Sequence, residues 1–190
     1  MLDGWVRVDC HVHTVASGDS VLRPEELVER AQAAGIDVVF VTDHHAVATA
    51  QRLAATTGIR VIVGEEIRTP AGEVLGLFLS ERIPYVLPID EVIERIHAQG
   101  GIVCLPHPYD EIRASVAAIA DQLCQSGRID AIEVFNAKAA TPDVNDLALD
   151  LARRHGLPGT AGSDAHDPDG IGAAYLEMPD FHTLSTDLEI

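Results

Sequence analysis

The chain has 190 residues, of which 47% are hydrophobic and 23% charged, with 30 acidic against 13 basic side chains and a formal net charge of −17. This composition predicts one folded domain over residues 1–190 and argues against a disordered polyelectrolyte or a membrane protein, because no apolar run approaches ~18 residues. The negative charge argues against binding to extended nucleic acid or to an anionic membrane surface.

Cysteine usage and the first residues bear on the cellular compartment. Cys10, Cys104 and Cys124 are far apart, and the first two stand in apolar runs. This pattern is typical of reduced, buried thiols and not of a disulfide framework. The N-terminal residues lack the basic and then apolar segments of an export signal. We therefore expect a cytoplasmic protein.

Short apolar runs alternate with segments of helical periodicity along the chain. The runs predict strands over residues 6–12, 38–42, 60–65, 101–105, 131–135, 158–161 and 173–177. Between them, predicted helices begin near Pro24, Ile89 and Thr141, and end at glycines 35, 100 and 156. Residues 73–79, after a Thr-Pro-Ala-Gly sequence, indicate a further extended segment inside one connection.

Strands joined by helix-length connections favour parallel pairing and right-handed crossovers, in a barrel or a doubly wound sheet. A complete eight-unit barrel takes ~250 residues, which is more than this chain has. The sequence therefore predicts an α/β fold with a reduced or distorted barrel of the TIM type.

Nearly every predicted strand ends in residues that bind metal ions. In chain order these are Asp9, His11 and His13; Asp43, His44 and His45; Glu65 and Glu66; His107; Glu133 and Asn136; Asp164 and His166. The carboxyl ends of the strands of a parallel barrel meet on one face, so these side chains should converge. Imidazole and carboxylate groups are common ligands of Zn, Mn and Fe(II). The pattern predicts a metal centre.

Each motif alone also has a structural interpretation. Residues 43–45 could cap a helix, residues 162–164 could form a tight turn, and a single His-x-His pair is often structural. These interpretations do not explain why six consecutive strand ends carry ligand-type residues. The joint pattern is therefore the stronger signal.

Together the motifs resemble those of the PHP family, named for polymerase and histidinol phosphatase. They are Asp9-Cys10-His11-Val12-His13-Thr14, Thr42-Asp43-His44, Gly64-Glu65-Glu66, His107-Pro108 and Gly162-Ser163-Asp164-Ala165-His166, and they span residues 8–172. The resemblance implies a distorted seven-stranded β/α barrel, two to three divalent ions (Zn, Mn or Fe) and hydrolysis of phosphoesters.

The resemblance also implies a ligand set. It assigns the first ion to His11, His13, Glu66 and Asp164, the second to Glu66 and His107, and the third to His44 and His166. Asp19 stands where some family members have a further histidine ligand. Where a histidine often follows the fifth strand, this chain has Glu133 to Asn136, which leaves the ligands of the second ion open. Aligning Gly-x-Glu selects Glu66 over Glu65 as the bridging carboxylate.

We expect a metal-bound hydroxide to attack phosphorus directly, because divalent ions lower the pKa of water toward ~7 and stabilise charge on a phosphate. The expected catalytic residues are His11, His13, Glu66, Asp164 and His166. Asp9 and Asp43 suit the orientation of imidazoles, or cap strands and helices. Candidate substrate contacts are Lys138, Arg68, Arg113 and His45, each of which could also be a surface charge or a cap.

The predicted substrate is a small phosphorylated metabolite or nucleotide. Two other functions remain open. An amidohydrolase barrel also uses His-x-His after its first strand, and PHP modules in DNA polymerases can bind metal with a structural or interaction role. Comparing activity on phosphomonoesters with activity on amides or lactones would distinguish a phosphoesterase from an amidohydrolase. Hydrolysis by the fully metal-loaded protein would distinguish an enzyme from a binding module.

Overall fold

The computed structural model describes residues 4–56 and 58–181. Its strands are β1 (Trp5–Val12), β2 (Val38–Val41), β3 (Arg60–Thr69), β4 (Gly72–Leu77), β5 (Ile102–Leu105), β6 (Ala131–Asn136), β7 (Gly159–Gly162) and β8 (Leu176–Pro179). Its helices are η1 (Val15–Ser17), α1 (Pro24–Ala34), α2 (Ala48–Thr56), α3 (Ile89–Ala98), α4 (Ala120–Gln125) and α5 (Pro142–His155).

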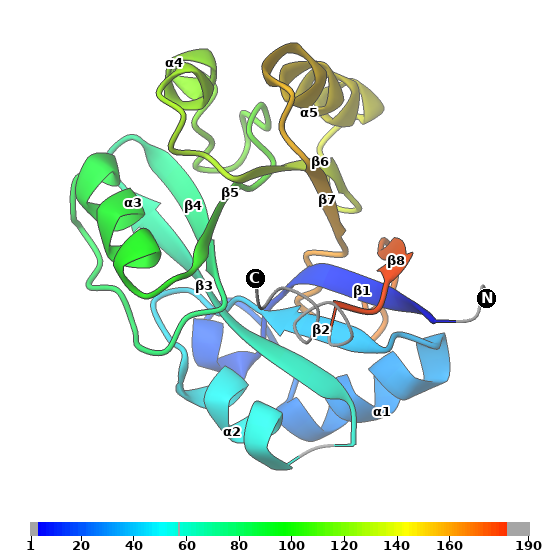
Figure 1. The fold of residues 1–190 in the computed structure, drawn as a ribbon. Coiled ribbons are helices and arrows are strands. Elements are labelled where there is room, and N and C mark those ends of the chain that lie inside the picture. Colours follow the sequence, from blue (N-terminus) through cyan, green and yellow to red (C-terminus); the bar gives the residue numbers. More distant parts are fainter. Residues whose placement is uncertain (1–3, 57, 182–190) are drawn as a thin grey trace, which may run out of the picture.

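The strands form one sheet in the order β7-β6-β5-β4-β3-β2-β1-β8, which curls into a nearly closed barrel with the α-helices on its outer side (Figure 1). The segment after β7 closes the barrel against the end of β1. The N–H of Asp164 donates to the carbonyl of His11 at 2.8 Å, and the N–H of His13 donates to the carbonyl of Ala165 at 2.9 Å. The predicted α/β distorted barrel is confirmed.

The barrel has eight strands where seven were expected, and the additional strand, β4, overlaps the further extended segment predicted over residues 73–79. Pro70 and Ala71 join β3 to β4 in a two-residue turn, so these strands pair antiparallel, and β4 also pairs antiparallel with β5. β8 pairs antiparallel with β1 and ends two residues later than the predicted strand over 173–177. The strand number and pairing differ from the expectation because a hairpin precedes the helix in the connection after residue 65. This connection is therefore not a simple parallel crossover.

An irregularity in β1 decides which of its side chains face the site. Val8 and Cys10 pack with residues of β2, β4 and β5, whereas Val12, of the same parity, packs with Leu27 of α1. The register with β2 shifts between Asp9 and Val12, so the chain changes face there. This shift explains why the odd-numbered residues at the end of β1 point into the barrel.

The cysteines and the helices bear on redox state and on membrane insertion. Cys10, Cys104 and Cys124 are buried and form no disulfide among the described residues. Over residues 4–56 and 58–181, none of the helices has both the length and the apolar character needed to cross a bilayer.

We predict that Gly162→Ala destabilises the fold by about 1–3 kcal/mol, because an added Cβ would lie 2.4 Å from the Cβ of His11 and 2.8 Å from its backbone nitrogen. Urea unfolding measures the change. Gly58→Ala is the matched control, since a Cβ there meets only the Gln32 side chain at an ordinary 3.6 Å. Equal stability of the two variants would contradict the tight β1–β7 contact.

Candidate metal centre

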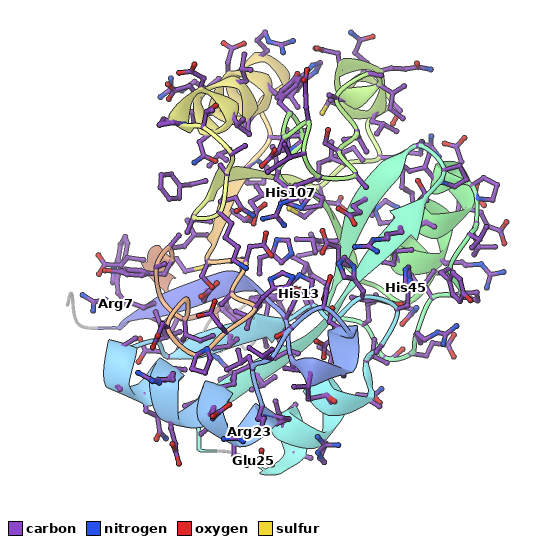
Figure 2. All side chains as sticks on the ribbon, turned by 180° about the vertical axis from the view of Figure 1, so that it is seen from behind. Arg7, His13, Arg23, Glu25, His45 and His107 are labelled. Atoms are coloured by element: carbon purple, nitrogen blue, oxygen red, sulfur yellow. The ribbon has the colours of Figure 1, made fainter. Side chains whose placement is uncertain are left out.

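The strand ends bring histidines and carboxylates together inside the barrel. Figure 2 shows His13 and His107 near the middle of the molecule, whereas Arg7, Arg23 and Glu25 lie at its periphery. His11 lies in β1 and His13 directly follows it, Glu66 lies in β3, and Asp164 lies two residues after β7. All of these side chains are buried, as the convergence of strand ends predicted.

The first group of donor atoms is the most compact. The Nε2 atoms of His11 and His13 lie 3.0 Å apart. Glu66 Oε2 lies 3.3 Å from the former and 3.1 Å from the latter. Asp164 Oδ1 lies 3.7 and 3.5 Å from the same two nitrogens. Two imidazole nitrogens and two carboxylate oxygens therefore face one small volume.

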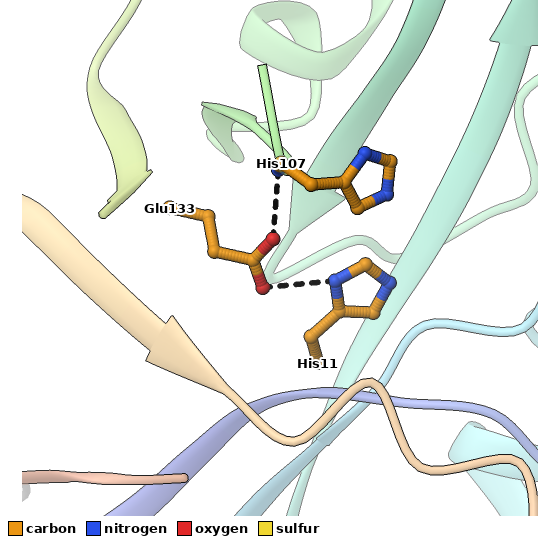
Figure 3. Close-up of side chains that lie close together, drawn as sticks. All are labelled: His11, His107 and Glu133. Carbon is orange, nitrogen blue, oxygen red and sulfur yellow. Dashed lines mark hydrogen bonds and ion pairs between the residues drawn. The ribbon is translucent and has the colours of Figure 1, made fainter. Parts of the chain in front are cut away.

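Glu133 orients two histidines of this cluster (Figure 3). Its Oε1 accepts a hydrogen bond from His11 Nδ1 at 3.0 Å, and its Oε2 accepts one from the backbone N–H of His107 at 2.8 Å. A proton held on His11 Nδ1 leaves the lone pair on Nε2, the atom that faces His13. His13 is arranged similarly, with Nδ1 2.9 Å from Ser17 Oγ.

A second group surrounds the other oxygen of Glu66. Glu66 Oε1 lies 3.1 Å from His107 Nε2, and Glu73 Oε2 lies 3.9 Å from that nitrogen. Glu73 was not among the predicted site residues. It lies on β4 directly opposite Arg68 of β3, so recognising the hairpin would have placed it on the same face as Glu66. The carboxylate of Glu65 points elsewhere, as expected.

A third group lies at the more exposed side. His44 Nε2 is 3.3 Å from Asp19 Oδ2, and His166 Nε2 is 3.7 Å from Asp19 Oδ1. Arg68 enters this group, because its Nη2 donates to His44 Nε2 at 3.0 Å. The structure thus brings all eight predicted ligands together in three adjoining groups.

The donor chemistry fits divalent ions. Asp164 Oδ1 is buried and has no hydrogen-bond partner within the described ranges, although it faces two imidazole nitrogens. Lone pairs of nitrogen and oxygen that converge without a proton between them repel one another unless a cation lies among them. The first group therefore fits a borderline divalent ion, and the second offers Glu66, His107 and Glu73 for another.

The protonation equilibria reflect this crowding. Burial by itself raises the pKa of Glu66, but nearby His11 and the hydrogen bonds of the surrounding imidazoles hold it well below its usual range. Burial lowers the pKa of His11, but the charges of Asp164 and Glu133 hold it well above its usual range. In the absence of ions, a proton on His11 thus compensates part of the charge of the surrounding carboxylates.

Asp9 and Asp43 hold backbone instead of imidazoles. Asp9 accepts hydrogen bonds from the N–H of Ser163 at 2.9 Å and of Gly172 at 3.3 Å. Asp43 accepts from the N–H and the hydroxyl of Thr14, at 2.5 and 2.7 Å. The expected direct orientation of imidazoles by these carboxylates is therefore not observed. They fix the chain on either side of the ligands.

Asn136 lies in the cluster as a hydrogen-bond donor. Its Nδ2 donates to Glu133 Oε2 at 3.0 Å and to Asp164 Oδ2 at 3.3 Å. An amide that donates to two carboxylates stabilises their negative charge. Asn136 therefore supports the ligands at the strand end where a histidine ligand was considered.

Arg113 reaches the cluster from the loop after β5. Its Nη1 lies 2.8 Å from Asp164 Oδ2, which leaves Asp164 Oδ1 facing the histidines. For Lys138 the structure gives a backbone contact, in which its N–H donates to Asn136 Oδ1 at 2.8 Å. Its predicted contact with phosphate stays a prediction.

His45 lies beside the cluster and not within it. Its ring is 4.9 Å from that of Tyr85 and 6.1 Å from that of His44. Burial, with the charges of His44 and Arg68, lowers its pKa. A direct substrate contact by His45 also stays a prediction.

Sequence comparison identifies the family. The PHP domain matches residues 9–156, and a region described as PHP-associated matches residues 142–188. The first match covers most of the chain, so this chain belongs to the PHP domain family. A relative from Methanocaldococcus jannaschii, the uncharacterized protein MJ1587, is 38% identical over 157 residues, which are 76% of this chain and 90% of the relative.

Solved structures share the fold at lower identity. A two-domain protein from Bacteroides vulgatus that contains a predicted PHP-like metal-dependent phosphoesterase has a TM-score of 0.70 and 24% identity, covering 88% of this chain and 55% of that chain. An amidohydrolase from Chromobacterium violaceum with bound sulfate has a TM-score of 0.71 and 17% identity, covering 94% and 96%.

A third structure bears on the expected exclusion of nucleic acid. Endonuclease Q, in complex with a 27-mer duplex substrate, has a TM-score of 0.66 and 19% identity, covering 86% of this chain and 50% of that chain. The same fold therefore occurs in a protein that binds a duplex substrate. The net charge of −17 does not by itself exclude nucleic acid for this chain.

Glu65 generates a prediction about pH and stability. Burial raises its pKa to about 7, against the hydrogen bond from the Ile83 N–H. A carboxyl group whose pKa is raised in the folded state stabilises the fold at low pH, and this stabilisation is lost as the pH rises through about 7. Relative to wild type, Glu65→Gln should gain about 2 kcal/mol of unfolding free energy between pH 5 and pH 8.

Urea unfolding of the chelator-treated protein at both pH values measures this gain. Glu94→Gln is a control for the loss of an exposed carboxylate on α3. A constant difference between Glu65→Gln and wild type across this range would show that Glu65 keeps an ordinary pKa.

Proposed function

We propose that the protein is a metal-dependent phosphoesterase that hydrolyses a small phosphorylated metabolite or nucleotide. The observation that carries the proposal is the first donor group, in which two imidazole nitrogens and two carboxylate oxygens converge within 3.0–3.7 Å. Membership of the PHP family and the PHP-like phosphoesterase fold of a structural relative support it.

His11, His13, Glu66 and Asp164 would hold the first ion, with Glu66 shared with a second ion held by His107 and Glu73. Bound divalent ions supply an activated water and positive charge opposite the phosphate oxygens. Zn, Mn and Fe(II) all suit this mixture of imidazole and carboxylate ligands.

The remaining residues orient and bind. Glu133 keeps a proton on His11 Nδ1, so that His11 Nε2 stays directed into the first group. Arg113 carries a permanent charge at Asp164 Oδ2, and its remaining guanidinium N–H groups can also donate to phosphate oxygens. In the net reaction, water attacks phosphorus, the P–O bond of the ester breaks, and the leaving oxygen gains a proton.

The proposal extends to organisation and compartment. The two family matches overlap at residues 142–156, which supports one PHP-type unit over residues 1–190. Three buried, unpaired cysteines support a reducing compartment such as the cytoplasm.

The central prediction concerns metal content and turnover together. Protein loaded with Mn(II) or Zn(II) should hydrolyse at least one member of a screen of sugar phosphates, nucleotides, 3′,5′-bisphosphates and histidinol phosphate. His11→Ala and Asp164→Ala should each lower metal content and reduce turnover by more than about 100-fold, because each removes a ligand of the first ion. His97→Ala, on α3, is the control.

Wild-type metal content and turnover in both variants would refute the assignment of the site. Turnover of amides or lactones without phosphoester hydrolysis would favour the amidohydrolase alternative. Cleavage confined to oligonucleotides would extend the substrate class to nucleic acid, and no hydrolysis by the fully loaded protein would favour a binding module.

Arg113→Met should raise KM for the phosphoester identified by the screen by about 10-fold or more, with a smaller change in kcat, because a guanidinium contact with a phosphate oxygen is lost. Steady-state kinetics measure both constants. Arg128→Met is the control, since Arg128 pairs with Asp90 away from the site. Unchanged KM would remove Arg113 from substrate binding.

A further inference from the structure

The third donor group differs from the first because a side-chain cation contacts one of its ring nitrogens directly. Arg68 Nη2 donates to His44 Nε2 at 3.0 Å and lies 3.8 Å from Asp19 Oδ2. We propose that the guanidinium of Arg68 takes the place of a third divalent ion, so that the protein binds two ions and uses Arg68 as the third cation. The inference rests on the proposed function and specifies which cations the site contains.

The lone pair that a third ion needs is the one that Arg68 uses. His44 Nε2 faces Asp19 Oδ2 at 3.3 Å, while His44 Nδ1 lies 3.4 Å from the backbone carbonyl of Glu66. A guanidinium N–H can only donate, so His44 Nε2 is the acceptor of this hydrogen bond, and Nδ1 is the ring nitrogen that can donate to the Glu66 carbonyl. The guanidinium N–H occupies this acceptor.

Arg68 is anchored at a second point. Its Nε donates to Glu73 Oε1 at 2.8 Å, and the Glu73 side chain is only 5% exposed. The two residues lie opposite each other in the β3–β4 hairpin, so the backbone register holds them together. A planar guanidinium fixed by hydrogen bonds to Nε and Nη2 keeps a defined orientation.

Arg113 shows the contrasting arrangement at the first group. It contacts Asp164 Oδ2 and leaves Oδ1 facing His11 and His13, so this arginine spares the atoms that face the first ion. Arg68 instead contacts the ring nitrogen that faces Asp19. Of the two arginines at the site, one leaves an ion position open and the other fills one.

The charge of Arg68 supports the same conclusion. A dication among Asp19, His44 and His166 would lie beside a permanent positive charge, which weakens its binding. A guanidinium in this place supplies positive charge for a phosphate oxygen without depending on free metal.

The test counts ions and does not depend on turnover. Chelator-treated protein is dialysed to equilibrium against defined free Mn(II), ions per chain are measured by elemental mass spectrometry, and anomalous diffraction at the Mn edge assigns each ion to a donor group. Wild type should bind two ions. Arg68→Gln should bind three, because His44, Asp19 and His166 are then free to hold one.

Two variants serve as controls. Arg68→Lys keeps a cation and should bind two ions. Arg95→Gln removes the same charge from α3, where Arg95 pairs with Glu91, and should also bind two. Circular dichroism confirms that each variant is folded.

Three ions in wild type, or no ion among Asp19, His44 and His166 in Arg68→Gln, would overturn the inference. Three ions together with phosphoester turnover would leave the proposed function intact. Two ions without any hydrolysis would leave the inference intact and overturn the proposed function.

Discussion

The structure depends on the burial of four carboxylates in one cluster. As whole residues, Glu66, Glu73, Glu133 and Asp164 are each at most 4% exposed. A carboxylate taken out of water is strongly unfavourable unless positive charge and hydrogen bonds compensate it. Arg113 and Arg68 supply two fixed positive charges, and Asn136 supplies amide hydrogens. The remaining excess of negative charge is what divalent ions would balance, so metal binding and stability of the barrel interior are coupled.

The barrel builds this cluster with local backbone strain at the strand ends. Non-glycine residues with positive φ follow three strands that supply the site: His45 at 54°, His107 at 27° and Asp164 at 52°. Such conformations persist only where surrounding contacts determine them, and they concentrate at functional sites. The hydrogen bonds that Asp9 accepts from Ser163, and Glu133 from His107, are contacts of this kind. At His107 and Asp164 the strained residue itself contributes a side chain to the cluster, whereas His45 lies beside it.

Much of this arrangement could be predicted from the sequence, because the carboxyl ends of barrel strands converge whatever their separation along the chain. The choice of Glu66 over Glu65 followed from motif alignment, and the structure places Glu65 against the Ile83 N–H on another face. The hairpin was the main omission. Without the antiparallel pairing of β3 with β4, neither the place of Glu73 nor its contact with Arg68 could be inferred. The register shift in β1 is likewise a tertiary property, set by pairing with β2.

The net charge of −17 has a narrower meaning than composition alone suggests. Charge summed over a whole surface governs long-range attraction, which salt screens over ~8–10 Å, whereas a bound phosphate responds to charges in direct contact with it. Around the metal centre those charges are Arg68, Arg113 and the ions that the donor groups would hold. An acidic surface therefore slows the approach of a polyanion but does not by itself determine what the site can bind. In the proposed site, substrate class would be decided by the contacts beside the ions, and the guanidinium groups of Arg68 and Arg113 would be the fixed part of those contacts.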